Sequence, residues 1–331
     1  MTHALDTPVE EQAAGRNFQW LKNPMTIALV IVVLLVAFGQ IFSPGFGAYS
    51  QVIAMLRVAS FLGFIAIGQT IVMLSGGTGI DLSVGKTATL GAIVAAKVMD
   101  GSNDNLLLGI LIPLAVGSLI GLANGLGILL LKIPPFVMTL GMMGVVTGII
   151  LAYTKGVAGG RSAPLLTSLV NDRWVLQIPG VLFLWVIAIV LVTIFLRRTW
   201  TGWNIFAIGA NRTAAHLSGV PVKRTVLISY TLSGFFAVVG GMMMLGYTET
   251  VFLNLADNLM LPSVAAVVIG GTLVAGGVGG YVGSAIGAVL LTILTSFLTT
   301  LNMPESGRII VNGVVLILLL TLYGRQRKLR S

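Results

Sequence analysis

The chain contains no cysteine and only two histidines among its 331 residues. The lack of cysteine excludes disulfide bonds, thiolate zinc sites, iron–sulfur clusters and cysteine nucleophiles. Two histidines leave little material for histidine-based metal binding or acid–base catalysis. We therefore expect no cysteine-based catalysis and no metal site on this chain.

Charge is scarce as well, since Asp, Glu, Lys and Arg make up 9% of the residues while hydrophobic residues make up 56%. Soluble proteins average about 25% charged residues, so this chain has too little charge to cover a water-exposed globule of its size. Disordered and collagen-like chains are excluded too, because the hydrophobicity is high and no Gly-X-Y period is present. The composition therefore predicts an all-α polytopic membrane protein.

Ten segments are apolar over roughly the 20 residues that a membrane helix needs. We expect helices, because backbone in lipid must satisfy its own hydrogen bonds and the ten-residue alternation of a membrane barrel is absent. Glycine-rich stretches predict broken helices near 75–85 and 276–281, and Gly76-Gly77-Thr78 is echoed by Gly270-Gly271-Thr272, which indicates two related halves. The ten segments are approximately 25–42, 55–74, 83–99, 106–131, 136–154, 180–196, 226–247, 261–278, 281–301 and 308–323.

The basic residues indicate the orientation, because short cytoplasmic loops carry an excess of Lys and Arg. With both termini in the cytoplasm, most Lys and Arg fall in inner loops, Lys86 among them, whereas Asp257 and most other acidic residues fall outside. We expect a polar cytoplasmic segment over 1–24, one transmembrane domain over 25–324 and a basic cytoplasmic tail over 325–331. The tail is interpreted as an anchor beside the last helix, so no nucleic-acid partner is expected.

Residues 75–87 form the most informative stretch. They are not a phosphate-binding loop, because five residues separate Gly79 from the following Gly-Lys pair where four are required. A broken helix is the better interpretation, with Asp81 as an isolated acid and Ser83 as the cap of the helix that follows. Lys86 is a candidate partner of Asp81. Two interpretations stay open, a polar group lining a pathway or gate and an ordinary turn at the cytoplasmic surface.

The connection over residues 197–225 is the longest on the expected inner side, and it holds five Lys or Arg residues and no Asp or Glu. Asn211 can cap a short helix over 213–217, and Gly219 can end that helix. Such a helix is suited to docking a soluble partner. A positively charged loop that only fixes the orientation explains the pattern equally well.

A third polar feature lies in the fourth and fifth segments. Asn124 is a polar residue within the fourth segment, and Pro134-Pro135 then forces a turn before Thr139. For Asn124, a hydrogen bond between helices is favoured over contact with a ligand.

Taken in order, these motifs resemble the permease subunits of bacterial ribose-type carbohydrate ABC transporters. The resemblance covers about 50–324, and the chain departs from the family pattern at Lys86, where a small residue is common, and at Trp203, where an Arg is common. The matching motifs are Gly79-Ile-Asp-Leu-Ser-Val-Gly85, Ala123-Asn-Gly125, Ile133-Pro-Pro-Phe-Val-Met-Thr-Leu-Gly141, Ala207-Ile-Gly-Ala-Asn211, Ala214-Ala-His-Leu-Ser-Gly-Val220, Ser233-Gly234, and Ala265-Ala-Val-Val-Ile-Gly-Gly-Thr272 with Gly276-Gly277.

The resemblance implies a multi-pass protein of the bacterial inner membrane that helps to import a monosaccharide or related carbohydrate. It implies a cytoplasmic ABC ATPase that uses ATP, a second permease copy and a periplasmic substrate-binding protein as partners, and no cofactor or enzymatic activity on this chain. The residues expected to couple to the ATPase are Asn211, Arg212, Ala214, Ala215, Ser218 and Gly219. The candidates for the pathway or gate are Gly79, Asp81, Ser83, Asn124 and Thr139.

Two other functions fit parts of the pattern. A ten-helix secondary carrier matches the length and topology, but it needs a membrane-embedded acid for ion coupling, and Asp81 is the one candidate. An ABC permease for branched-chain amino acids shares the general architecture. A requirement for a separate ATPase and binding protein would exclude the carrier.

Overall fold

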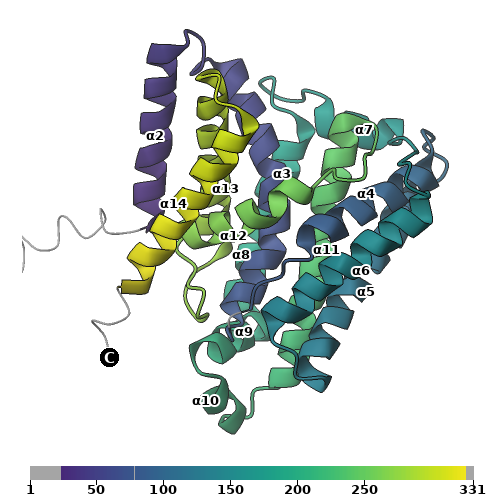
Figure 1. Ribbon diagram of the computed structural model, residues 1–331, viewed down its shortest axis with the longest axis vertical. Helices are drawn as coiled ribbons and strands as arrows, with labels where there is room; N and C mark the ends of the chain where they lie inside the picture. The colour runs from purple at the N-terminus through teal and green to yellow at the C-terminus, as the bar shows by residue number, and fades with distance from the viewer. Residues whose placement is uncertain (1–23, 78, 326–331) are drawn as a thin grey trace, which may run out of the picture.

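The computed structural model describes residues 24–77 and 79–325, which fold into a bundle of α-helices with one short 3-10 helix (Figure 1). Most of the predicted segment 1–24 and of the predicted tail 325–331 lies outside these residues. The helices are α2 (Pro24–Phe42), α3 (Tyr49–Leu74), α4 (Val84–Met99), α5 (Leu106–Leu130), α6 (Pro135–Thr154), α7 (Pro164–Asn171), α8 (Gly180–Arg198), α9 (Trp200–Ala210), α10 (Arg212–Leu217), α11 (Val222–Thr248), η2 (Asp257–Leu259), α12 (Met260–Ile269), α13 (Tyr281–Thr300) and α14 (Glu305–Arg325).

Among the described residues, seven helices are long and apolar enough to cross a membrane, namely α2, α3, α5, α6, α8, α11 and α13. Each of them corresponds to one of the segments expected from the sequence. The prediction of an all-α polytopic membrane protein is therefore confirmed.

The other three segments expected from the sequence are not among these seven helices. The segment expected over 83–99 is the 16-residue helix α4, and the last segment lies within the 21-residue helix α14. The segment expected over 261–278 is wrong as a continuous helix, because α12 ends at Ile269 after 10 residues and residues 270–280 form a loop. Four glycines of this loop have positive φ, which ends the helix earlier than hydropathy alone indicates.

The predicted break before α4 is present, since residues 75–77 and 79–83 are not helical. Gly76 and Gly77 have φ of 75° and 67°, a region that glycine enters without steric cost. A Cβ added to Gly79 would lie 2.9 Å from the Val72 carbonyl oxygen, so the chain turns back closely along the last turn of α3. The break therefore places a polar stretch of backbone inside the bundle.

Helices α3 and α11 form the centre of the bundle, and α11 packs against α3, α4 and α5 (Figure 1). From Ala59 to Leu74 every residue of α3 is buried. A helix that is apolar on all sides is expected at the core of a bundle. By contrast, α2 and α6 are the least buried of the spanning helices, which fits an outer face that lipid covers.

Glycines set the close approach of α5 to α11. A Cβ on Gly117 would lie 2.5 Å from the Gly234 carbonyl oxygen, and a Cβ on Gly121 would overlap the Tyr230 carbonyl. This is the small-residue packing that lets membrane helices approach closely. For the similar pair Gly144 and Gly148 on α6, an added Cβ would meet no atom of the described chain within 4 Å.

Candidate functional site

The Asp81 carboxylate is the centre of a buried polar cluster between α3 and α4. Asp81 is 1% exposed. Its Oδ1 accepts hydrogen bonds from the Ser83 backbone N–H at 3.0 Å and from the Ser83 hydroxyl at 2.6 Å. Its Oδ2 accepts a hydrogen bond from the Ser233 hydroxyl of α11 at 2.8 Å. The interpretation of Asp81 as part of an ordinary surface turn is therefore wrong.

Two further helices bind this cluster. The amide Nδ2 of Asn124, on α5, donates to the Ser83 hydroxyl at 2.9 Å, and Asn124 has no exposed surface. The hydroxyl of Thr139, on α6, donates to the Ile80 carbonyl at 3.1 Å. Asn124 thus makes the contact between elements of the bundle that the sequence favoured.

The structure brings together all five residues that the sequence marked as pathway or gate candidates. They are either part of the stretch between α3 and α4 or hydrogen-bonded to it. One detail differs, because Ser83 stands at the N-cap position of α4 without capping it. Its hydroxyl instead donates to the Asp81 carboxylate, the stronger acceptor.

Lys86 does not pair with Asp81, so that prediction is wrong. Its Nζ lies 2.6 Å from Oδ2 of Asp257, which opens η2 before α12. The orientation count had placed Lys86 inside and Asp257 outside, and this contact contradicts that assignment. Helices α4 and α12 both begin within the bundle. Lys86 and Asp257 therefore do not belong to the surface loops whose Lys and Arg content indicates orientation.

Several other buried or partly buried polar residues of the bundle were not identified as candidates from the sequence. Asp257 was counted only as an outer-loop acid, although it is isolated between apolar runs as Asp81 is, and the same signal would have found it. Gln69 on α3 has no exposed surface, and neither amide atom has a hydrogen-bond partner in the described structure. The Thr87 hydroxyl and the Asp257 Oδ1 atom are likewise buried without a hydrogen-bond partner in the described structure. Buried polar atoms without protein partners can offer hydrogen bonds to a polar solute.

The predicted short helix in the basic connection is present as α10. The Asn211 side chain accepts a hydrogen bond from the Ala214 backbone N–H at 3.0 Å, which is the expected cap. Gly219 follows the helix with φ of 81°. Of the six residues expected to couple to an ATPase, Ala215 is buried and the other five are exposed, and α10 projects at one end of the molecule (Figure 1).

The connection contains a second helix, α9, where we expected a loop. Thr199 caps it, because its hydroxyl accepts a hydrogen bond from the Gly202 backbone N–H at 3.1 Å. A Ser or Thr directly before an apolar run is the signal that could have identified this helix. Together α9 and α10 form a compact pair between α8 and α11.

Three backbone segments meet at the C-terminal end of α9, and we call this contact the glycine junction. It consists of the end of α3 at Leu74–Gly76, Gly209 of α9 and Gly276-Gly277 of the loop before α13. The Gly277 N–H donates to the Leu74 carbonyl at 3.0 Å. A Cβ on Gly209 would overlap that same carbonyl, and one on Gly76 would lie 2.8 Å from the Gly209 Cα. The three segments therefore touch through backbone atoms, without intervening side chains.

Comparison with known proteins identifies the family. Residues 51–320 match the family model described as the branched-chain amino acid transport system / permease component. The inner membrane ABC transporter permease protein YjfF of Escherichia coli K12 is 34% identical over 77% of this chain and 78% of its own length. No solved structure matches the chain significantly.

Two further relatives are named for sugars. The galactose/methyl galactoside import permease protein MglC of Escherichia coli K12 is 34% identical over 90% of this chain and 93% of its own length. The ribose import permease protein RbsC of Bacillus subtilis is 32% identical over 88% of this chain and 89% of its own length. The chain therefore belongs to this family of ABC transporter permeases, in which it resembles the ribose-type sugar permeases.

Proposed function

We propose that this chain forms half of the pathway by which an ATP-driven importer moves a monosaccharide or related carbohydrate across the bacterial inner membrane. The observation that carries the proposal is the buried polar cluster at Asp81, which an apolar membrane bundle would not keep without a use for it. The sugars in the names of its relatives support the substrate class.

The sugar would be handled by neutral hydrogen-bonding groups more than by charge. The Asp81 carboxylate already accepts from Ser83 and Ser233, so its role is to position the stretch between α3 and α4. Gln69 and Thr87 have unpartnered polar atoms that can bind sugar hydroxyls when the bundle opens. The permease would alternate between an outward-open and an inward-open state. This change has to be driven by contacts that differ between those two states.

ATP hydrolysis would take place on a separate cytoplasmic ABC ATPase, and this chain would bind no cofactor of its own. The ATPase would dock on α10 through Asn211, Arg212, Ala214, Ser218 and Gly219, with the buried Ala215 holding the helix on its neighbours. The glycine junction links α9 to the Asp81 stretch, which gives docking a direct route to the pathway. A periplasmic binding protein and a second permease copy would complete the importer.

We propose ten membrane segments in one domain over 25–324, with α4 and α12 as short helices that begin within the bundle. Both termini would be cytoplasmic. The start of α2 at Pro24 lies beside Gly271 of the α12–α13 loop, and the visible end of α14 is at the same end of the molecule as α10 (Figure 1). The five basic residues of 197–225 favour a cytoplasmic location for that end, because short cytoplasmic loops carry an excess of Lys and Arg.

Reconstitution into proteoliposomes tests this function. The permease would be combined with the ATPase and binding protein from the same gene cluster, and uptake of labelled ribose, galactose, fructose and leucine measured with and without ATP. We expect ATP-dependent uptake of a sugar. Uptake of leucine alone would support the amino-acid function that the family description names, and uptake driven by an ion gradient without the ATPase would support a secondary carrier.

A further inference from the structure

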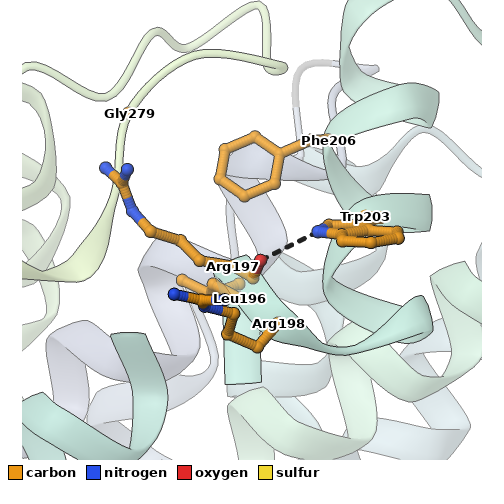
Figure 2. Close-up of a pocket in the computed structure, with 6 residues that line it drawn as sticks. All are labelled: Leu196, Arg197, Arg198, Trp203, Phe206 and Gly279. Atoms are coloured by element: carbon orange, nitrogen blue, oxygen red, sulfur yellow. Dashed lines mark hydrogen bonds between the residues drawn. The ribbon is translucent and has the colours of Figure 1, made fainter. Parts of the chain in front are cut away.

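A cavity of about 670 Å³ opens outside the Asp81 cluster, between the end of α8, helix α9 and the loop before α13 (Figure 2). It is a wide, open hollow at the surface of the bundle and not an enclosed chamber. The lining residues are Leu196, Arg197, Arg198, Trp203, Phe206 and Gly279. Nothing in the proposed transport mechanism uses this cavity.

The cavity carries two positive charges at the end of α8. The Arg197 side chain extends across it toward Gly279, and Arg198 lies beside it (Figure 2). Both side chains are exposed, and neither forms an ion pair with a carboxylate of residues 24–77 or 79–325. The pair therefore offers charge-assisted donors to an anion, and guanidinium groups match phosphate oxygens particularly well.

An apolar stripe on α8 leads directly to these arginines. Its residues are spaced three, four or one apart, so they share one face of the helix, and each side chain is at least half exposed. Arg197 and Arg198 follow the last of them by three and four positions and continue the same face. The stripe consists of Val186 (56% exposed), Ile187 (53%), Val190 (51%), Leu191 (59%) and Ile194 (50%).

Two exposed tryptophans at the start of α9 follow directly after these arginines in the chain. Trp200 and Trp203 are 80% and 53% exposed, with their rings in an edge-to-face arrangement at 5.6 Å between centroids. The Trp203 indole N–H donates to the Arg197 carbonyl at 2.9 Å, which fixes that ring at the mouth of the cavity. Exposed tryptophans are typical of the depth at which lipid headgroups lie.

We propose that this cavity binds the phosphate headgroup of an anionic phospholipid, whose acyl chains lie along the apolar stripe of α8. The lipid comes from the leaflet on the α10 side, because the cavity is at that end of α8. A soluble phosphate compound would use the arginines but leave the stripe and the exposed tryptophans unexplained. A phospholipid uses all three features at once.

Native mass spectrometry of the purified full-length permease tests the proposal. The wild type would be titrated in detergent with phosphatidylglycerol and with phosphatidylcholine of identical acyl chains. We expect one tightly retained phosphatidylglycerol per chain and at least about tenfold weaker retention of phosphatidylcholine. Equal retention of the two lipids would overturn the proposal, and this comparison needs no variant.

Variants locate the lipid. Arg197→Gln with Arg198→Gln should weaken phosphatidylglycerol binding at least about tenfold, whereas Arg197→Lys with Arg198→Lys should retain most of it. The matched control, Lys223→Gln with Arg224→Gln, removes the same charge from the start of α11 outside the cavity and should leave binding unchanged. An equal loss in the control would show that only overall charge matters and would contradict the assigned site.

A competition experiment separates a lipid from a soluble anion. Inorganic phosphate and ATP would be added to the wild-type complex with phosphatidylglycerol. We expect neither to displace the lipid at concentrations below about a hundred times that of the lipid, because neither contacts the α8 stripe. Displacement at equal concentration would identify the cavity as a general phosphate site and overturn the assignment to lipid.

Discussion

Lys86 on the first turn of α4 and Asp257 in η2 are joined by an ion pair of 2.6 Å although 171 residues separate them in sequence. Their side chains are 19% and 33% exposed, so water screens the pair only partly. The contact ties the starts of the two short helices together beside the Asp81 stretch. Any opening of the bundle between α4 and α12 has to break or move this pair.

We predict that Lys86→Gln and Asp257→Asn each destabilise the protein, because each leaves a partly buried charge without its partner. A cost of about 1–3 kcal/mol is expected for either change. The double variant should be no less stable than either single variant, because it removes both charges. Thermal unfolding of the four proteins in detergent measures this, with Lys132→Gln as the control at an exposed lysine. Additive losses in the double variant would show that the two residues do not interact.

A second prediction concerns Asp81→Asn. The amide keeps the size of the carboxylate, but one accepting oxygen becomes an NH2 donor, so the hydrogen bonds from Ser83 and from Ser233 can no longer both be accepted. We expect ATP-dependent sugar uptake to fall by at least about tenfold, the effect of losing one charge-assisted hydrogen bond in the pathway. Asp100→Asn is the matched control, since Asp100 is exposed and its φ of 43° suits asparagine equally well. Unchanged uptake by the Asp81 variant would remove this cluster from the mechanism.

The glycine junction gives a third prediction. Gly209→Ala requires no change of backbone conformation, because Gly209 lies within α9 and its φ is not in the positive region. Its methyl group would nevertheless overlap the Leu74 carbonyl and force α9 away from α3. We expect ATP hydrolysis by the assembled importer to become uncoupled from sugar uptake. Gly144→Ala, which meets nothing within 4 Å, should have no such effect.

The ratio of sugar molecules imported to ATP hydrolysed distinguishes these outcomes. A normal ratio in the Gly209 variant would contradict a mechanical role for the junction. A variant that does not assemble at all would be recognised by its elution profile.

A fourth prediction addresses docking on α10. Arg212→Glu combined with Ala214→Asp and Ala215→Asp should abolish binding of the ATPase while the permease still inserts into the membrane. Co-purification with the tagged ATPase measures binding, and membrane fractionation measures insertion. Arg173→Glu repeats only the Arg→Glu part of this change, in the connection after α7, away from α10, and should not affect binding (Figure 1). Wild-type ATPase recovery with the triple variant would mean that α10 is not the docking helix.

The sequence was sufficient for the parts of the fold that depend on local signals. Hydropathy located the long helices, glycines located the break at 75–83, and the cap at Asn211 located α10. Four of the five candidates in the Asp81 cluster are polar residues, which are conspicuous in an apolar chain, and the fifth, Gly79, belongs to the glycine-rich break. All of these depend on residues that are close together in sequence.

What the sequence did not predict depends on contacts between distant segments. Lys86 was assigned to Asp81 because that acid is five residues away, whereas its real partner comes from η2. The charge rule also assumes that every polar residue between apolar runs is in a surface loop, and this assumption fails where α4 and α12 begin inside the bundle. The glycine junction could likewise not be predicted from the sequence, since Leu74, Gly209 and Gly277 are brought together only when the helices pack.

The absence of native cysteine makes one measurement especially direct, because a single introduced thiol is then the only one in the chain. Ser233→Cys places it beside Asp81, where Ser233 has no exposed surface. In the reconstituted importer, its labelling by a membrane-impermeant thiol reagent would be followed from each side with and without ATP. We predict that ATP changes the side from which the thiol reacts and that the transported sugar slows the reaction. A thiol that stays unreactive in every state, or that reacts regardless of ATP and sugar, would contradict the claim that the Asp81 cluster lies on the transport pathway.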